Sequence, residues 1–103
     1  MGLRAKQSEF AEAVGLLIHF AYQQGYEITL GDAFATTGHI ADSFHYKRLA
    51  IDLNLFIDGE YITDNRGYDK LGAFWKTLSP DASWGGDFTG KNKGDYNHFS
   101  WGE

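Results

Sequence analysis

A helical pattern of apolar residues opens the chain. Ser8 belongs to the residue types that cap helix N-termini, and Gly25 lies where a glycine commonly ends a helix. Between them, apolar residues recur three and four positions apart and so share one helical face: Phe10, Val14, Leu17, Ile18 and Ala21. We therefore predict a helix over residues 8–24.

Alternation of apolar and polar positions follows, with the period of two that is typical of strands. Residues 26–30, YEITL, form a short run of this kind. Residues 49–56 alternate more strongly, with leucine or isoleucine at each odd position and Ala50, Asp52 and Asn54 between them. The pattern predicts a second strand with one strongly apolar face and one face of small and polar groups.

A hairpin and a second helix are expected next. Asp58 and Gly59 form a hairpin turn signal, after which residues 61–62 open a return strand. A further helix follows, capped by Asp64 or Asn65 and ended before Pro80. Its apolar positions share one face: Tyr68, Leu71, Trp75 and Leu78.

The last strand is predicted at residues 98–101, HFSW, where His98 and Ser100 face one way and the two aromatic residues the other. Residues 31–44 and the stretches SWGGDF and GKNKGDYN have the composition of loops. These elements predict an α+β fold, with two helices packed on a small antiparallel sheet. At 103 residues, the chain is expected to form a single domain, residues 1–103.

Composition narrows the possible chemistry. The chain has no cysteine, which excludes disulfides, thiolate zinc sites and cysteine nucleophiles. A formal charge of −5 argues against a nucleic-acid partner. No stretch approaches the ~20 apolar residues of a membrane span, so no membrane insertion is expected. The N-terminal residues lack the apolar core of a secretory signal, so we expect the protein to be made and folded in a cytoplasm.

The aspartate of the central strand allows two interpretations. Asp52 lies on the face opposite the leucine and isoleucine side chains. An unpaired carboxylate is costly to bury, so this face is either solvated or holds a cation. A solvated strand aspartate is the simpler interpretation of Asp52 taken alone.

Two histidines and a second carboxylate favour the cation. His45 precedes the strand and can face Asp52 only if residues 46–48 turn. Asp95 and His98 form a D-x-x-H unit near the chain end. Two imidazoles and one carboxylate are a ligand set of catalytic zinc, and a nearby carboxylate can serve as general base. The spacing permits this arrangement without requiring it.

The motifs together resemble a known family. The pattern S-x-H-x6-D followed by D-x-x-H resembles the zinc D-alanyl-D-alanine carboxypeptidases, dipeptidases and L-alanyl-D-glutamate endopeptidases. The fuller strings SFHYKRLAIDLNLFIDGEYITD, YDKLGAFW, WGGDF and NHFSW are similar to the phage endolysin and prophage peptidase branch of that family. The likeness covers nearly the whole chain, with several separate motifs in the same order.

This resemblance implies a role for each matching residue. His45, Asp52 and His98 are implied as zinc ligands. Asp95 is implied as the base that takes a proton from the attacking water and returns it to the leaving amine. Further residues are implied to lie near the substrate: Ser43 beside the metal, and Trp84, Gly85, Gly86 and Asp87 along the cleft wall.

Two positions depart from the family pattern. Many relatives carry an arginine, able to polarise the scissile carbonyl, where this chain has Ala35. Arg48 and His39 are the candidates for a substitute donor to that carbonyl. Either another donor serves, or turnover is slower than in relatives with that arginine. Many relatives also have glycine at the position of Arg48.

The function implied is that of a zinc-dependent peptidoglycan peptidase, an endolysin-like L-alanyl-D-glutamate endopeptidase acting on the stem peptide. Two alternatives remain: a D-alanyl-D-alanine carboxypeptidase or dipeptidase, and a catalytically weak cell-wall-binding domain that keeps zinc for structure. A phage enzyme of this type would collect in the host cytoplasm and meet the wall once the inner membrane is breached. We expect a monomer.

Overall fold

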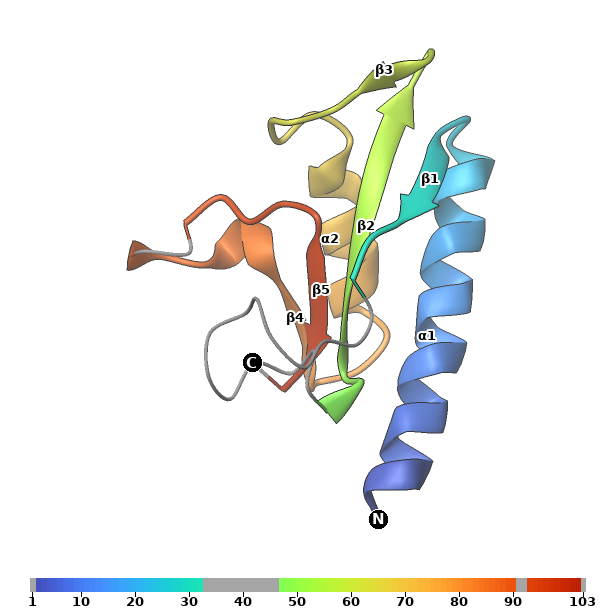
Figure 1. Cartoon of the computed structure of the whole chain (residues 1–103), viewed down its shortest axis with the longest axis vertical. Helices are drawn as coiled ribbons and strands as arrows, with labels where there is room; N and C mark the ends of the chain where they lie inside the picture. Colours follow the sequence, from blue (N-terminus) through green and yellow to red (C-terminus); the bar gives the residue numbers. More distant parts are fainter. Residues whose placement is uncertain (1, 33–46, 91–92, 103) are drawn as a thin grey trace.

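The computed structural model describes residues 2–32, 47–90 and 93–102 (Figure 1). In the described part, the elements follow the order α1 (Leu3–Gln23), β1 (Glu27–Leu30), β2 (Ala50–Ile57), β3 (Glu60–Tyr61), α2 (Tyr68–Lys76), β4 (Ala82–Trp84), a 3-10 turn η2 (Gly85–Asp87) and β5 (His98–Trp101). Two helices and a small antiparallel sheet form an α+β fold, as the sequence predicted.

Strand β2 is the centre of the sheet. The strand order is β1-β2-β5-β4, and β3 also pairs with β2 through the hairpin. All four pairings are antiparallel. Strand β1 runs along one edge of β2, while β5 and β3 share the other edge, with β5 near the start of β2 and β3 near its end (Figure 1).

The predicted apolar face of β2 is confirmed. Leu49, Ile51, Leu53 and Leu55 are all buried and belong to one core with both helices. Trp75 of α2 is fully buried at its centre, where it meets Phe10 of α1 edge to face. Edge-to-face rings add to the burial energy of such a core. The helices thus cover one sheet face and leave the Asp52 face for the site.

Truncating the core should be costly. Leu53 is 0% exposed, so we expect Leu53→Ala to lower the free energy of unfolding by about 2–5 kcal/mol, through lost burial and the cavity left behind. Chemical denaturation would measure it. Leu30 pairs with Leu53 across the strands but is 68% exposed, so Leu30→Ala is the matched control and should cost under about 0.5 kcal/mol. A cost for Leu53→Ala as small as that of the control would mean that Leu53 does not face the core.

Several predicted boundaries differ from those in the structure. Helix α1 begins at Leu3 after Gly2, not at Ser8, because residues 3–7 are mostly good helix formers and extend it. Helix α2 begins after Gly67 with no side-chain cap, and Asp64 instead accepts a hydrogen bond from the Arg66 N–H in the preceding turn.

Helix α2 also ends at Lys76, so Leu78 lies beyond it. Strand β4 was not predicted, because SWGGDF has the composition of a loop. The hairpin at Asp58 and Gly59 is confirmed: both have positive φ, 52° and 80°, as a type I′ turn requires. Its return strand begins at Glu60, one residue earlier than expected. Most of the predicted loop 31–44 lies outside the described residues.

Across the described ranges, no helix is both long and apolar enough to cross a membrane.

Candidate active site

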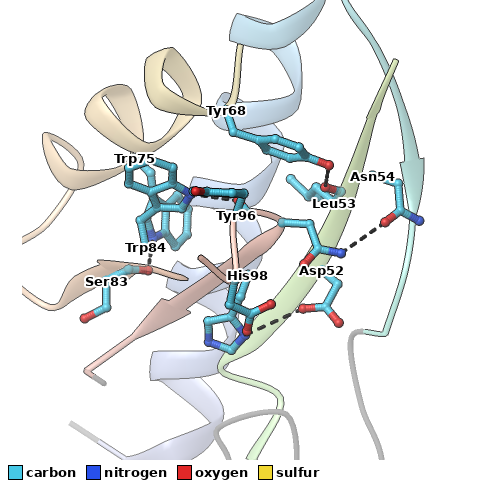
Figure 2. Close-up of polar contacts among 11 residues, drawn as sticks. Asp52, Leu53, Asn54, Tyr68, Trp75, Ser83, Trp84, Tyr96 and His98 are labelled. Carbon is cyan, nitrogen blue, oxygen red and sulfur yellow. Dashed lines mark hydrogen bonds and ion pairs between the residues drawn. The ribbon is translucent and has the colours of Figure 1, made fainter. Parts of the chain in front are cut away.

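Asp52 and His98 are direct partners across strands β2 and β5. The backbone N–H and carbonyl of Asp52 point away from β5, toward Asp32 and Gly31. The two residues therefore form a non-hydrogen-bonded antiparallel pair, the kind whose side chains approach most closely. Figure 2 shows the carboxylate and the imidazole directed at one another, with His98 Nδ1 3.6 Å from Asp52 Oδ1. The sequence placed both residues near one site, and the sheet register brings them together.

The separation of this pair suits two ligands of one metal ion. At 3.6 Å, the two atoms are too far apart for a hydrogen bond. Two donors bound tetrahedrally to one zinc ion, each at ~2.0–2.2 Å, lie about 3.3–3.6 Å apart. A neutral imidazole and a carboxylate are also donor types that zinc accepts. Among the described residues, no three histidine or acidic side chains form a metal-binding group; His45, the third predicted ligand, lies outside them.

Asp95 stands beside the pair but is more open to solvent. Its carboxylate Oδ2 lies 4.0 Å from His98 Nδ1, and its side chain is 47% exposed, compared with 22% for Asp52 and 6% for His98. The Asp95 carbonyl accepts a hydrogen bond from the His98 N–H, 3.1 Å away. This tight turn explains the D-x-x-H spacing, because it returns the Asp95 side chain to the imidazole. The carboxylate can thus reach a bound molecule from the solvent side.

The WGGDF segment packs against the turn that carries Asp95. The Trp84 indole is buried between Gly72 of α2 and Gly86, at both of which a Cβ atom would collide with the ring. Its Nε1–H donates to the Tyr96 carbonyl, 2.7 Å away, within the turn that carries Asp95. Trp84 therefore anchors that turn, and its contact with substrate stays a prediction.

The other predicted wall residues have distinct positions. Asp87 forms an exposed ion pair with Lys76 of α2, at 2.7 Å. At Gly85, an added Cβ would collide with the carbonyl oxygen of Asp95 and lie 2.9 Å from the His98 Cβ. Gly85 thus allows the Asp95 turn to lie directly against η2.

The turn that the sequence requires before β2 is marked by the backbone conformation of Arg48. Its φ is +57°, in the left-handed region that glycine adopts most easily. A backbone turn therefore lies directly before the start of β2. Ser43 and His45 themselves, and the Ala35 and His39 positions, lie outside the described residues.

Tyr68 was expected only as an apolar residue of the second helix, but its buried hydroxyl also bonds the backbone of β2 next to the site. Strands β5 and β3 leave Leu53 and Leu55 between them on this edge. The Tyr68 hydroxyl accepts from the Leu55 N–H at 2.9 Å and donates to the Leu53 carbonyl at 3.4 Å (Figure 2). Burial, with smaller contributions from Tyr61 and Asp52, raises the pKa of Tyr68, so the hydroxyl keeps the proton that it donates.

Sequence reasoning also did not identify the hydrogen-bonded pair of Asn54 and Asn97. The Asn97 Nδ2 donates to Asn54 Oδ1, 3.1 Å away, and the Asn97 carbonyl accepts from the Leu53 N–H. Together these bonds fasten the turn before β5 to the polar face of β2. The only sequence signal was the position of Asn54, two residues after Asp52 on the same face.

A comparison with known proteins identifies the family of the chain. Residues 36–101 match the family model described as D-alanyl-D-alanine carboxypeptidase, and they include both the S-x-H-x6-D and the D-x-x-H motifs. A search of curated proteins finds no match to the chain. The match extends over more than half of the 103 residues and ends at the last strand, which carries His98. The chain therefore belongs to the D-alanyl-D-alanine carboxypeptidase family of peptidases.

Proposed function

We propose that the protein is a zinc-dependent peptidoglycan peptidase that hydrolyses the amide bond between L-alanine and D-glutamate in the stem peptide. The observation that carries this proposal is the Asp52–His98 pair, whose 3.6 Å separation suits two ligands of one ion. Membership of a peptidase family and the adjacent Asp95 carboxylate support it. A purely structural zinc site would have no use for Asp95 at that position.

The zinc ion would be held by His45, Asp52 and His98. When bound, it supplies Lewis-acid chemistry at the scissile carbonyl and lowers the pKa of a neighbouring water. His98 and Asp52 are well suited to hold it, because both side chains are fixed on paired strands of the sheet and are largely buried. Ligands fixed in this way lose little conformational freedom on binding.

Asp95 carries the proton in this reaction. As the water oxygen forms its bond to the carbonyl carbon, Asp95 accepts the proton that the water loses. As the carbon–nitrogen bond breaks, Asp95 donates that proton to the amine nitrogen, which leaves neutral instead of as an unstable anion. Its exposure, 47%, is consistent with a group that must meet both water and substrate.

Products released from purified peptidoglycan test the bond assignment. We expect mass spectrometry to find fragments with new N-terminal D-glutamate, or its amide, and new C-terminal L-alanine. Release of free D-alanine instead would identify a carboxypeptidase, the activity named by the family description. A zinc-loaded protein that releases no new amino groups would favour a cell-wall-binding domain.

Zinc content provides a separate test. Elemental analysis of protein purified without added metal should find one zinc per chain, and His45→Ala should remove most of it, because two remaining ligands bind zinc weakly. His19 lies exposed on α1, far along the chain from these motifs, so His19→Ala is the matched control and should keep full zinc content. Unchanged zinc in His45→Ala would contradict the ligand assignment.

A further inference from the structure

The sheet face that carries Asp52 continues beyond the site to two aromatic rings. Alternate positions of β2 hold Asp52, Asn54 and Phe56, which therefore share the face opposite the buried leucines. Figure 2 shows Asp52 and Asn54 on the same side of the strand. Tyr61 of β3 is the direct cross-strand partner of Phe56, so it lies on this face as well. One surface thus connects the Asp52–His98 pair to the hairpin.

Phe56 and Tyr61 form an aromatic platform that is open to a ligand. Their ring centroids are 5.3 Å apart, with the ring planes tilted by 43°. Tyr61 is exposed and Phe56 is partly exposed, and neither belongs to the core that the described residues form. A cross-strand aromatic pair stabilises a hairpin, and it does so without its outer ring faces. Exposed apolar surface beside a site is a common mark of ligand contact.

Polar side chains border the aromatic platform. Across β1 and β2, Glu27 pairs with Phe56 and Thr29 pairs with Asn54, and both β1 residues are exposed. The bond from Asn97 engages Oδ1 of Asn54, so the amide N–H groups of Asn54 can donate elsewhere. A sugar ring suits this combination, because its C–H bonds can lie on the electron-rich ring faces while its hydroxyl groups bond to the polar border.

The proposed substrate carries a sugar close to the scissile bond. In peptidoglycan, the L-alanine of the stem is joined through a lactyl group to a sugar ring of the glycan strand. The alanine and the lactyl group together span about two residue lengths, ~7 Å, before the ring begins. Phe56 lies four residues beyond Asp52, which is ~13 Å along the strand. A substrate with its acyl side along β2 therefore brings the sugar ring to the aromatic platform.

The stem peptide itself fits the aromatic platform less well. The alanine side chain offers a single methyl group, which covers little of two aromatic rings. The glutamate side chain offers a carboxylate, whose transfer from water to an apolar ring face is unfavourable. The sugar is the part of the substrate with a broad C–H face and no charge.

We propose, resting on the proposed function, that Phe56 and Tyr61 bind the sugar ring on the acyl side of the scissile bond. The enzyme thus acts on stem peptides that are still attached to the glycan strand, and it cleaves free stem peptides less efficiently. Binding at the aromatic platform lies away from the reacting atoms, and it helps to hold the alanine carbonyl at the Asp52–His98 pair.

Two synthetic substrates with the same stem peptide test the proposal, one with the lactyl-linked sugar and one with the lactyl group alone. We expect kcat/KM to be roughly 10-fold higher with the sugar, the scale of one aromatic stacking contact. Tyr61→Ala should remove most of this preference, whereas Tyr61→Phe keeps the ring and should keep the preference. Leu16 on α1 is 50% exposed, compared with 49% for Tyr61, so Leu16→Ala is the matched control and should keep the full preference.

Melting curves should first establish that each variant is folded. Equal kcat/KM for the two substrates would overturn sugar binding while leaving the peptidase assignment intact. A Tyr61→Ala protein that loses activity equally on both substrates would show that the aromatic platform does not contact the sugar. If zinc-loaded protein cleaves neither substrate nor purified peptidoglycan, the proposed function fails, and the inference fails with it.

Discussion

Replacing Asp95 with asparagine should lower peptide hydrolysis by at least ~100-fold while leaving the bound zinc in place. Asparagine has nearly the same shape as aspartate but does not take up a proton at neutral pH. The Asp95 carboxylate is more exposed than Asp52 and lies 4.0 Å from His98 Nδ1, beyond the 3.6 Å of the proposed ligand pair. A general base requires this placement, because a further protein ligand would close the position needed for water.

Both quantities should be measured on one preparation, zinc by elemental analysis and hydrolysis with peptidoglycan as substrate. Glu12→Gln makes the same change from carboxylate to amide on the exposed side of α1, and it should lose less than about twofold in rate. Loss of zinc together with activity in Asp95→Asn would make Asp95 a ligand. An Asp95→Asn variant as active as its parent would show that the proton transfer proposed for Asp95 is wrong.

The fold was predictable wherever burial imposes a local periodicity. The strand at 50–57 shows its apolar face as plain alternation, and α2 has its apolar stripe. Strand β4 has no such signal: three residues precede two glycines, and the strand exists because it pairs with β5, a partner distant in sequence. The start of α1 was misplaced for the opposite reason, since Ser8 is a good cap but its preceding residues continue the helix equally well.

Candidate site residues could be named from the sequence, but the residues that hold them in place could not. Asp52 and His98 could be singled out because a carboxylate and an imidazole within strands are unusual and chemically specific. Their contact depends on the register between β2 and β5, which cannot be inferred from the sequence of either strand alone. The anchoring role of Trp84 and the hydroxyl bridge of Tyr68 could not be inferred, because each joins elements that meet only in the folded chain.

Gly85 contacts the Asp95 turn so closely that no side chain fits between them. An added Cβ at Gly85 would collide with the Asp95 carbonyl oxygen and press on the His98 Cβ, 2.9 Å away. The same carbonyl accepts the hydrogen bond from the His98 N–H that closes the turn. If the turn shifts to relieve the collision, Asp95 moves relative to the imidazole.

We accordingly expect Gly85→Ala to lower hydrolysis by about 100-fold, the loss typical of a ~1 Å misplacement of a reacting group. Overpacking should also lower the free energy of unfolding by about 1–3 kcal/mol, so rates should be compared well below the melting transition. Gly15 is exposed within α1 and has open space where a Cβ would stand, so Gly15→Ala should stabilise the protein by up to about 1 kcal/mol and leave the rate unchanged. A folded Gly85→Ala protein with full activity would show that catalysis does not depend on the close contact between η2 and the Asp95 turn.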